Sequence, residues 1–157
     1  MKPILRTIPL ALGLALAAGI ATYSHAARQP RPARSCRENL RQLGAAMRRY
    51  LSDHERRLPP ADRWAEELAP YLKGGDAWYC PQCSPRAHSY AMNRRVADCD
   101  AGDEKLWGKV LLFESGAGRK NAADAGESLC SPARHKGGNY FLLVDGRIVQ
   151  RDTPPPF

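Results

Sequence analysis

The first regular pattern in the chain is a set of apolar residues that recur every three or four positions. This spacing is typical of the buried face of an amphipathic helix, and the residues that follow it are Leu40, Leu43, Met47, Tyr50 and Leu51. Ser35 precedes the set, and Glu38 stands three positions after Ser35, which is the capping-box arrangement that starts a helix. We therefore predict a helix that begins after Ser35 and stops before Pro59-Pro60.

A second, shorter helix is predicted to begin near Asp62, a candidate N-cap residue, and to end at Gly74-Gly75. Its buried side would consist of Trp64, Leu68, Tyr71 and Leu72. The next stretch, "HSYAMNRRV", is ambiguous between strand and helix. By contrast, "KVLLFES" contains a short, continuous apolar run, which favours a buried strand.

The stretch "RHKGGNYFLLVDGRIV" predicts a β-hairpin near the end of the chain. Residues 140–144 are rich in β-forming types, and Asp145-Gly146 is a strong hairpin signal because both positions of a two-residue turn need a positive φ. We expect residues 140–144 to pair antiparallel with residues 147–151.

Helices come first along the chain and strands last, which favours the α+β fold class. The first helix should pack on a small antiparallel sheet that ends in the hairpin. In this arrangement Leu40, Leu43, Met47 and Leu51 would lie against the sheet that contains residues 111–113 and 141–143.

The N-terminal 26 residues have a basic start, an apolar run over residues 8–23, and small residues at Ser24 and Ala26. This pattern is typical of a secretory signal peptide or a short membrane anchor. The run is slightly shorter than the ~20 residues of a comfortable bilayer span, so cleavage and anchoring both stay open. Lys2 and Arg6 precede the run and favour an N-terminus on the cytoplasmic side. We therefore expect the remainder to face the periplasm from the inner membrane, or to be secreted after cleavage.

The chain has 157 residues, which is one domain's worth, and a formal net charge of +8. Alanine and proline are also abundant, so genomic base composition accounts for the arginines as readily as a basic surface for anionic lipid, cell-wall polymer or nucleic acid. No aromatic residues are interleaved with the arginines as in nucleic-acid-binding motifs, so we expect no specific nucleic-acid binding.

Residues 27–34 form a Pro- and Arg-rich linker, and residues 153–157 form a stiff tail.

Several separated pieces of the chain occur in a fixed order. They are "CRENLRQLGAAMRRYLSDHERRLPPADRW", "YCP", "SYAMN", "LLFES" and the His-x9-Asp-Gly hairpin. Together they resemble the bacterial prepilin-like proteins with a C-terminal His-x9-Asp-Gly domain, over about residues 36–150. The resemblance implies a pilin-like domain over residues 35–152, with an N-terminal helix laid across a small antiparallel sheet.

The same resemblance implies a non-enzymatic pilin- or pseudopilin-like protein that serves assembly or interaction at the cell envelope, in a type II secretion or type IV pilus-like context. The partners it implies are the inner membrane and other pilin-like or secretion-system proteins. The chain departs from the family at its N-terminus, because it lacks the Gly-Phe-Thr-Leu-Ile-Glu type cleavage signature and has no acidic residue before Glu38. We therefore expect a pilin-derived domain that is tethered or secreted in another way.

The hairpin motif contains the first candidate functional residues. His135 could serve as a metal ligand or a catalytic base, but an extended strand would place it about 30 Å from Asp145 at ~3.3 Å per residue. We interpret the motif as structural, with Asp145 and Gly146 forming the turn. His135 would then anchor the first strand through a hydrogen bond from its ring to the backbone or to a nearby side chain. No catalytic or cofactor-binding residue is assigned.

Five cysteines follow the N-terminal segment, and disulfides are the usual state of cysteines in exported proteins. The candidates are Cys80, Cys83, Cys99 and Cys130, which leaves Cys36 as the odd one. These four are also candidate zinc ligands, because Cys80-x2-Cys83 has finger spacing and His88 or His135 could complete the set. The alternative function is therefore a small exported zinc-binding or thiol/disulfide module.

Two other cofactor classes fit less well. The surroundings of Cys80 and Cys83 lack the βαβ context of thioredoxin-like enzymes, and Ser84 stands where a c-type haem site needs histidine. An acidic stretch, "DCDAGDE", could bind calcium but lacks the EF-hand spacing, so we interpret it as a solvated loop.

Overall fold

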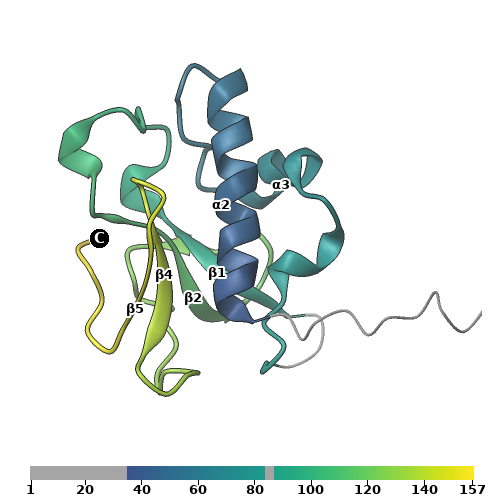
Figure 1. The fold of residues 1–157 in the computed structure, drawn as a ribbon, viewed down its shortest axis with the longest axis vertical. Helices are drawn as coiled ribbons and strands as arrows, with labels where there is room; N and C mark the ends of the chain where they lie inside the picture. Colours follow the sequence, from purple (N-terminus) through teal and green to yellow (C-terminus); the bar gives the residue numbers. More distant parts are fainter. Residues whose placement is uncertain (1–34, 84–86) are drawn as a thin grey trace, which may run out of the picture. The chain divides into compact units, whose positions relative to one another are not determined.

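The computed structural model describes residues 35–83 and 87–157 (Figure 1). The predicted signal or anchor over residues 1–26 and the linker over residues 27–34 lie outside the described residues. Within the described part of the chain, no helix has both the length and the apolar character needed to span a bilayer.

The principal helix is α2, Cys36–Asp53. The Ser35 hydroxyl accepts a hydrogen bond from the backbone N–H of Glu38 at 3.2 Å, which confirms the predicted cap. The helix ends earlier than Pro59-Pro60, because Glu55 and Arg56 adopt positive φ angles of 50° and 64° and turn the chain away.

The second helix, α3 (Trp64–Leu68), is shorter than predicted. Its N-cap residue is Arg63 rather than Asp62, and the Arg63 side chain makes no capping bond. A residue far along the chain provides the hydrogen-bond acceptor for the first turn instead, since the backbone N–H of Ala65 donates to Asn121 Oδ1 at 2.9 Å. The remaining helical turns are the short 3₁₀ segments η1 (Ala69–Tyr71), η2 (Gly75–Trp78), η3 (Arg94–Val96) and η4 (Glu104–Leu106).

Five strands form one sheet in the order β3-β1-β2-β4-β5, with β3 and β5 at its edges. The strands are β1 (His88–Asn93), β2 (Val110–Gly118), β3 (Ala123–Asp124), β4 (Asn139–Leu143) and β5 (Ile148–Arg151). The α+β class and the helix packed on a sheet are thus confirmed, and "HSYAMN" is a strand. The prediction of a purely antiparallel sheet was wrong, because the two-residue β3 pairs parallel with β1.

Different segments of the chain pack on the two faces of the sheet. α2 lies across one face (Figure 1), where Leu40, Leu43 and Met47 join a core cluster with Leu112 and Leu142. The opposite face carries a second cluster, and its members are Ala91, Val110, Phe113, Ala122, Phe141 and Leu143. The predicted packing of α2 on the sheet that contains residues 111–113 and 141–143 is therefore confirmed. Phe113, Phe141 and Leu143 of these strands belong to the second cluster on the other face.

The C-terminal tail covers the opposite face. The backbone N–H of Val110 donates to the Pro156 carbonyl at 2.8 Å, and the rings of Phe113 and Phe157 meet edge to face with centroids 5.1 Å apart. Residues 153–157, which the sequence analysis set apart as a tail, thus belong to the folded domain.

The β4–β5 hairpin has a longer loop than the two-residue turn expected at Asp145-Gly146. The Gly146 N–H donates to the Leu143 carbonyl and the Leu143 N–H donates to the Arg147 carbonyl, each at 2.9 Å. Gly146 has a φ of 86°, whereas Asp145 is not among the residues with positive φ. The loop therefore contains three residues, with a glycine in the left-handed region after an ordinary turn.

Candidate functional site

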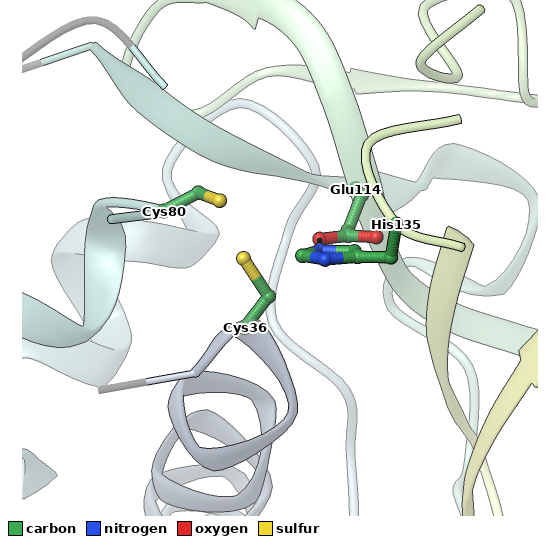
Figure 2. A group of neighbouring side chains, drawn as sticks. All are labelled: Cys36, Cys80, Glu114 and His135. Carbon is green, nitrogen blue, oxygen red and sulfur yellow. Dashed lines mark hydrogen bonds and ion pairs between the residues drawn. The ribbon is translucent and has the colours of Figure 1, made fainter. Parts of the chain in front are cut away.

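Four side chains from four separate segments converge beside the N-terminal end of α2 (Figure 2). They belong to Cys36, Cys80, Glu114 and His135, and their candidate ligand atoms all lie within 4.8 Å of one another. Cys36 is the first residue of α2, Cys80 follows η2, Glu114 lies on β2, and His135 precedes β4. We call these residues the Cys36 cluster.

Neighbouring helices and strands fix the positions of Cys36 and Cys80. Cys36 lies four and seven positions before Leu40 and Leu43, so it shares their buried face of α2 and is 1% exposed. Cys80 is 3% exposed, and its backbone N–H donates to Ser89 Oγ at 2.9 Å, which ties the segment after η2 to β1.

Glu114 and His135 form a pair inside the domain. Glu114 is fully buried two positions after Leu112, on the side of β2 that faces α2. Its Oε1 lies 2.9 Å from His135 Nε2, and its Oε2 accepts the backbone N–H of Tyr140 at 2.8 Å. The His135 side chain is only 14% exposed, and its partner is Glu114 rather than Asp145. Asp145 lies beyond the other end of β4, where it pairs with Arg147.

The two thiols are electrostatically unequal. Cys36 donates a hydrogen bond to the Cys80 sulfur, and this bond is the main reason that the pKa of Cys80 falls to about 6. Because Cys36 is the donor, and because burial and Glu114 also oppose a charge there, the pKa of Cys36 is raised. A helix N-terminus by itself favours a thiolate, but at Cys36 these opposing effects are larger. Of the two thiols, Cys80 is therefore the more acidic.

Arg134 supplies a nearby positive charge. Its guanidinium donates to the carbonyl oxygens of Ser89 and Ser115, so the charge is fixed between β1 and β2. The positive charge of Arg134 lowers the pKa values of Cys83 and Cys130, but burial raises them by more. The net result is a raised pKa for Cys83 and a pKa of about 11 for Cys130. Cys83 and Cys130 thus lie near Arg134 as neutral thiols.

The cysteines expected to act together do not form one group. All five cysteines are free thiols in this structure. Of Cys80, Cys83, Cys99 and Cys130, only Cys80 belongs to the Cys36 cluster. Cys99 lies elsewhere and bonds the Arg95 carbonyl through its sulfur, while Cys36, which the sequence analysis left without a partner, lies against Cys80.

The acidic stretch at residues 98–104 stabilises its own loop. Asp100 accepts the backbone N–H of Gly102 at 2.7 Å, and Asp103 accepts that of Lys105 at 3.0 Å. Among the described residues, these carboxylates do not gather into a group of three candidate metal ligands.

A surface cavity of about 570 Å³ lies at the opposite end of α2 from Cys36. Its lining includes Arg48 and Leu51 from α2 together with Val144 and Trp107. Trp107 is 52% exposed and is the one large hydrophobic side chain that stands out on the surface of the described residues. Arg56 and Asp145 also line the cavity, which therefore combines apolar surface with charged side chains of both signs.

Two residues of the Cys36 cluster, Cys36 and Glu114, were not predicted from the sequence as candidate ligands. Cys36 continues the helical spacing of Leu40 and Leu43 toward the N-terminus, which was a signal that its side chain faces inward. Glu114 interrupts the apolar run of β2, and a carboxylate in a buried strand needs a bonded partner. Neither signal identifies the partner residues, because these lie on other segments.

The arrangement has two chemical capacities. Two sulfurs, a carboxylate and an imidazole can hold a divalent cation, or Cys36 and Cys80 can be oxidised to a disulfide. The near-complete burial of both sulfurs restricts the approach of a substrate. Comparison with protein-family models, with curated proteins and with solved structures gave no match to this chain.

Proposed function

We propose that this chain is an exported, non-enzymatic, pilin-like protein that serves assembly or interaction at the cell envelope. The observation that carries the proposal is the position of α2, which begins directly after the predicted linker and lies along one face of the sheet. In such an arrangement, the predicted anchor and its linker are followed in sequence by the helix that covers one face of the sheet.

The burial of the thiols supports a non-enzymatic role over a thiol oxidoreductase. A catalytic cysteine has to meet its substrate, so it is at least partly exposed. Cys80, the first cysteine of the Cys80-x2-Cys83 motif, is 3% exposed, and the motif occupies a turn after η2 rather than the start of an α-helix.

The surface that we assign to interaction is the cavity beside Trp107. Arg48 is exposed and has no ion-pair partner among the described residues, and Leu51, Val144 and Trp107 offer apolar contacts around it. The occupant that fits this lining is a segment of an envelope protein that presents a carboxylate next to an apolar side chain. Exposed aromatic and arginine side chains of this kind often provide most of the binding energy at protein interfaces.

Protease accessibility tests the location. The full chain is expressed in a diderm bacterium, and protease is added to spheroplasts whose cytoplasmic marker stays intact. We expect the domain to be digested, and a variant that lacks residues 8–23 to be protected. Protection of the full chain in intact spheroplasts would contradict export.

Site-specific photo-crosslinking tests the interaction. A photoreactive phenylalanine analogue in place of Trp107 should give a defined adduct with one envelope protein, and the same analogue in place of exposed Arg119 should not. Arg48→Glu should abolish the adduct at position 107, because it reverses the charge that attracts the carboxylate. Equal labelling at both positions, or labelling that is insensitive to Arg48→Glu, would refute the assigned surface.

A further inference from the structure

We propose that the Cys36 cluster is a structural zinc site, in which Cys36, Cys80, Glu114 and His135 bind one Zn²⁺ ion. This inference goes beyond the proposed envelope role and does not depend on it. It also differs from the zinc set suggested by the Cys80-x2-Cys83 spacing, because Cys36 takes the place of Cys83.

The distances suit a tetrahedral ion. With Zn–S bonds of ~2.3 Å and Zn–N or Zn–O bonds of ~2.0 Å, the ligand atoms of a tetrahedral zinc site lie about 3.3–3.8 Å apart. In this structure the four candidate ligand atoms lie within 4.8 Å of one another. Small side-chain rotations are therefore enough to bring them to coordination distance.

The donor set also suits zinc rather than a harder ion. Calcium and magnesium prefer oxygen ligands, whereas thiolate sulfur together with imidazole nitrogen is the usual set for zinc. All four positions of a tetrahedron are filled by protein atoms, which is the arrangement of structural rather than catalytic zinc sites.

Surrounding groups already orient the ligands. The Tyr140 N–H holds Glu114 Oε2, so that Oε1 faces His135 at 2.9 Å. Ser89 holds the backbone of Cys80. Contacts of this second layer are what keep metal ligands in place.

The charge of the bound cluster would be small. Two thiolates, one carboxylate and a neutral imidazole around Zn²⁺ leave one net negative charge, and the fixed guanidinium of Arg134 lies near enough to influence Cys80. Cysteine binds zinc as the thiolate, so binding of the ion releases thiol protons to solvent.

The competing explanation is a disulfide between Cys36 and Cys80. A disulfide accounts for two of the four residues, but not for the fully buried Glu114 or for the approach of His135 to the same point. A metal ion accounts for all four. The site would join α2, the segment after η2, β2 and the loop before β4 at a single point.

The test uses the full chain, purified anaerobically with a reductant and stripped of metal by a chelator. Titration with Co²⁺, a spectroscopic substitute for Zn²⁺, should give one bound ion per chain with thiolate-to-cobalt charge-transfer absorption, and Zn²⁺ should displace it. Cys36→Ser and His135→Ala should each weaken binding by tenfold or more. The matched control is Cys99→Ser, which removes a thiol outside the cluster and should bind Co²⁺ like the unaltered chain.

His135→Ala keeps the test decisive if Cys36→Ser does not fold. It leaves both sulfurs in place, so charge-transfer absorption should persist at saturating Co²⁺ while the affinity falls. Equal Co²⁺ affinity in His135→Ala and the unaltered chain, or substoichiometric binding without charge-transfer absorption, would overturn the proposal. So would peptide mapping that finds a Cys36–Cys80 disulfide in the chain isolated from envelopes without reductant. None of these results bears on protease accessibility, which tests the envelope role separately.

Discussion

The two faces of the sheet are buried by different means. One face is covered by α2, a regular helix whose residues Leu40 and Leu43 are completely buried. The other face is covered by irregular segments and by the last residue of the chain, Phe157, which packs on Phe113. The helix covers its face through many side chains at regular spacing, whereas the tail is held by a few contacts.

This difference predicts unequal sensitivity to substitution. On the α2 face, each apolar side chain is surrounded by others, so its removal leaves a cavity that the neighbours fill only partly. On the opposite face, we expect the tail to separate from the sheet more readily, because few contacts hold it. Substitutions on the two faces therefore test that contrast.

Leu43→Ala should have the largest effect on stability. Leu43 is fully buried at the centre of the α2 face, and we expect the free energy of unfolding to fall by about 2–5 kcal/mol. Urea unfolding monitored by tryptophan fluorescence measures the change. Leu51→Ala is the matched control on the same helix, because Leu51 is only partly buried and should cost less. An equal loss of unfolding free energy in both variants would mean that α2 does not pack on the sheet through the face that contains Leu43.

Phe157→Ala should cost less, about 1–3 kcal/mol, because Phe157 keeps part of its surface exposed and a fully buried Phe costs ~3–5 kcal/mol. The variant should also make residues 153–157 more sensitive to limited proteolysis, which mass spectrometry detects. Thr153→Ala, an exposed change in the same segment, is the control and should leave stability unaltered. A Phe157→Ala variant as stable as the control would show that the tail does not contribute to the second core.

Gly146→Ala tests the hairpin whose strands contribute side chains to both faces. Gly146 has a φ of 86°, and an L-residue with a Cβ is disfavoured there by about 1–2 kcal/mol. Gly75→Ala is the matched control, since Gly75 lacks a positive φ and a Cβ at that position would meet no atom within 4 Å. Thermal unfolding compares the two variants, and an unchanged midpoint for Gly146→Ala would contradict the three-residue loop.

Asp145→Asn should have the smallest effect, below ~1 kcal/mol, because its partner Arg147 is exposed. The hydrogen bond from Arg147 lowers the pKa of Asp145, so the ionised carboxylate stabilises the folded state. This contribution is present above the unfolded pKa of ~3.9 and is lost as the pH falls through the lowered folded value. The stability difference between the variant and the unaltered chain should therefore be measurable at pH 7 and disappear near pH 2. A difference that persists at pH 2 would exclude the ion pair as its cause.

Local patterns were sufficient to predict several elements of this fold. The start of α2, its buried face, the strand at "KVLLFES" and the closing hairpin all follow from residues that are neighbours in sequence. The N-terminus of α3 was predicted incorrectly because its capping group comes from Asn121, far along the chain. The docking of Phe157 was missed for the same reason, since nothing in the tail itself indicates a partner.

The candidate site depends even more on distant contacts. Its four residues belong to four segments, and each segment has a plausible structural role when considered alone. Cysteine spacing suggested Cys83 as a second zinc ligand beside Cys80, because separation along the chain was the only measure of proximity. Folding instead brings Cys36 next to Cys80, since the buried face of α2 extends to its first residue.

The edges of the sheet limit how copies of this domain can associate. β5 is an edge strand, and an unpaired edge is normally a template for strand addition by another chain. Here Gln150 and Arg151 are exposed on β5, and three prolines without backbone N–H groups follow shortly after it. The other edge, β3, is only two residues long. Continuous sheets that run from one copy into the next are therefore disfavoured, and a polymer of this protein would be built through helices or loops.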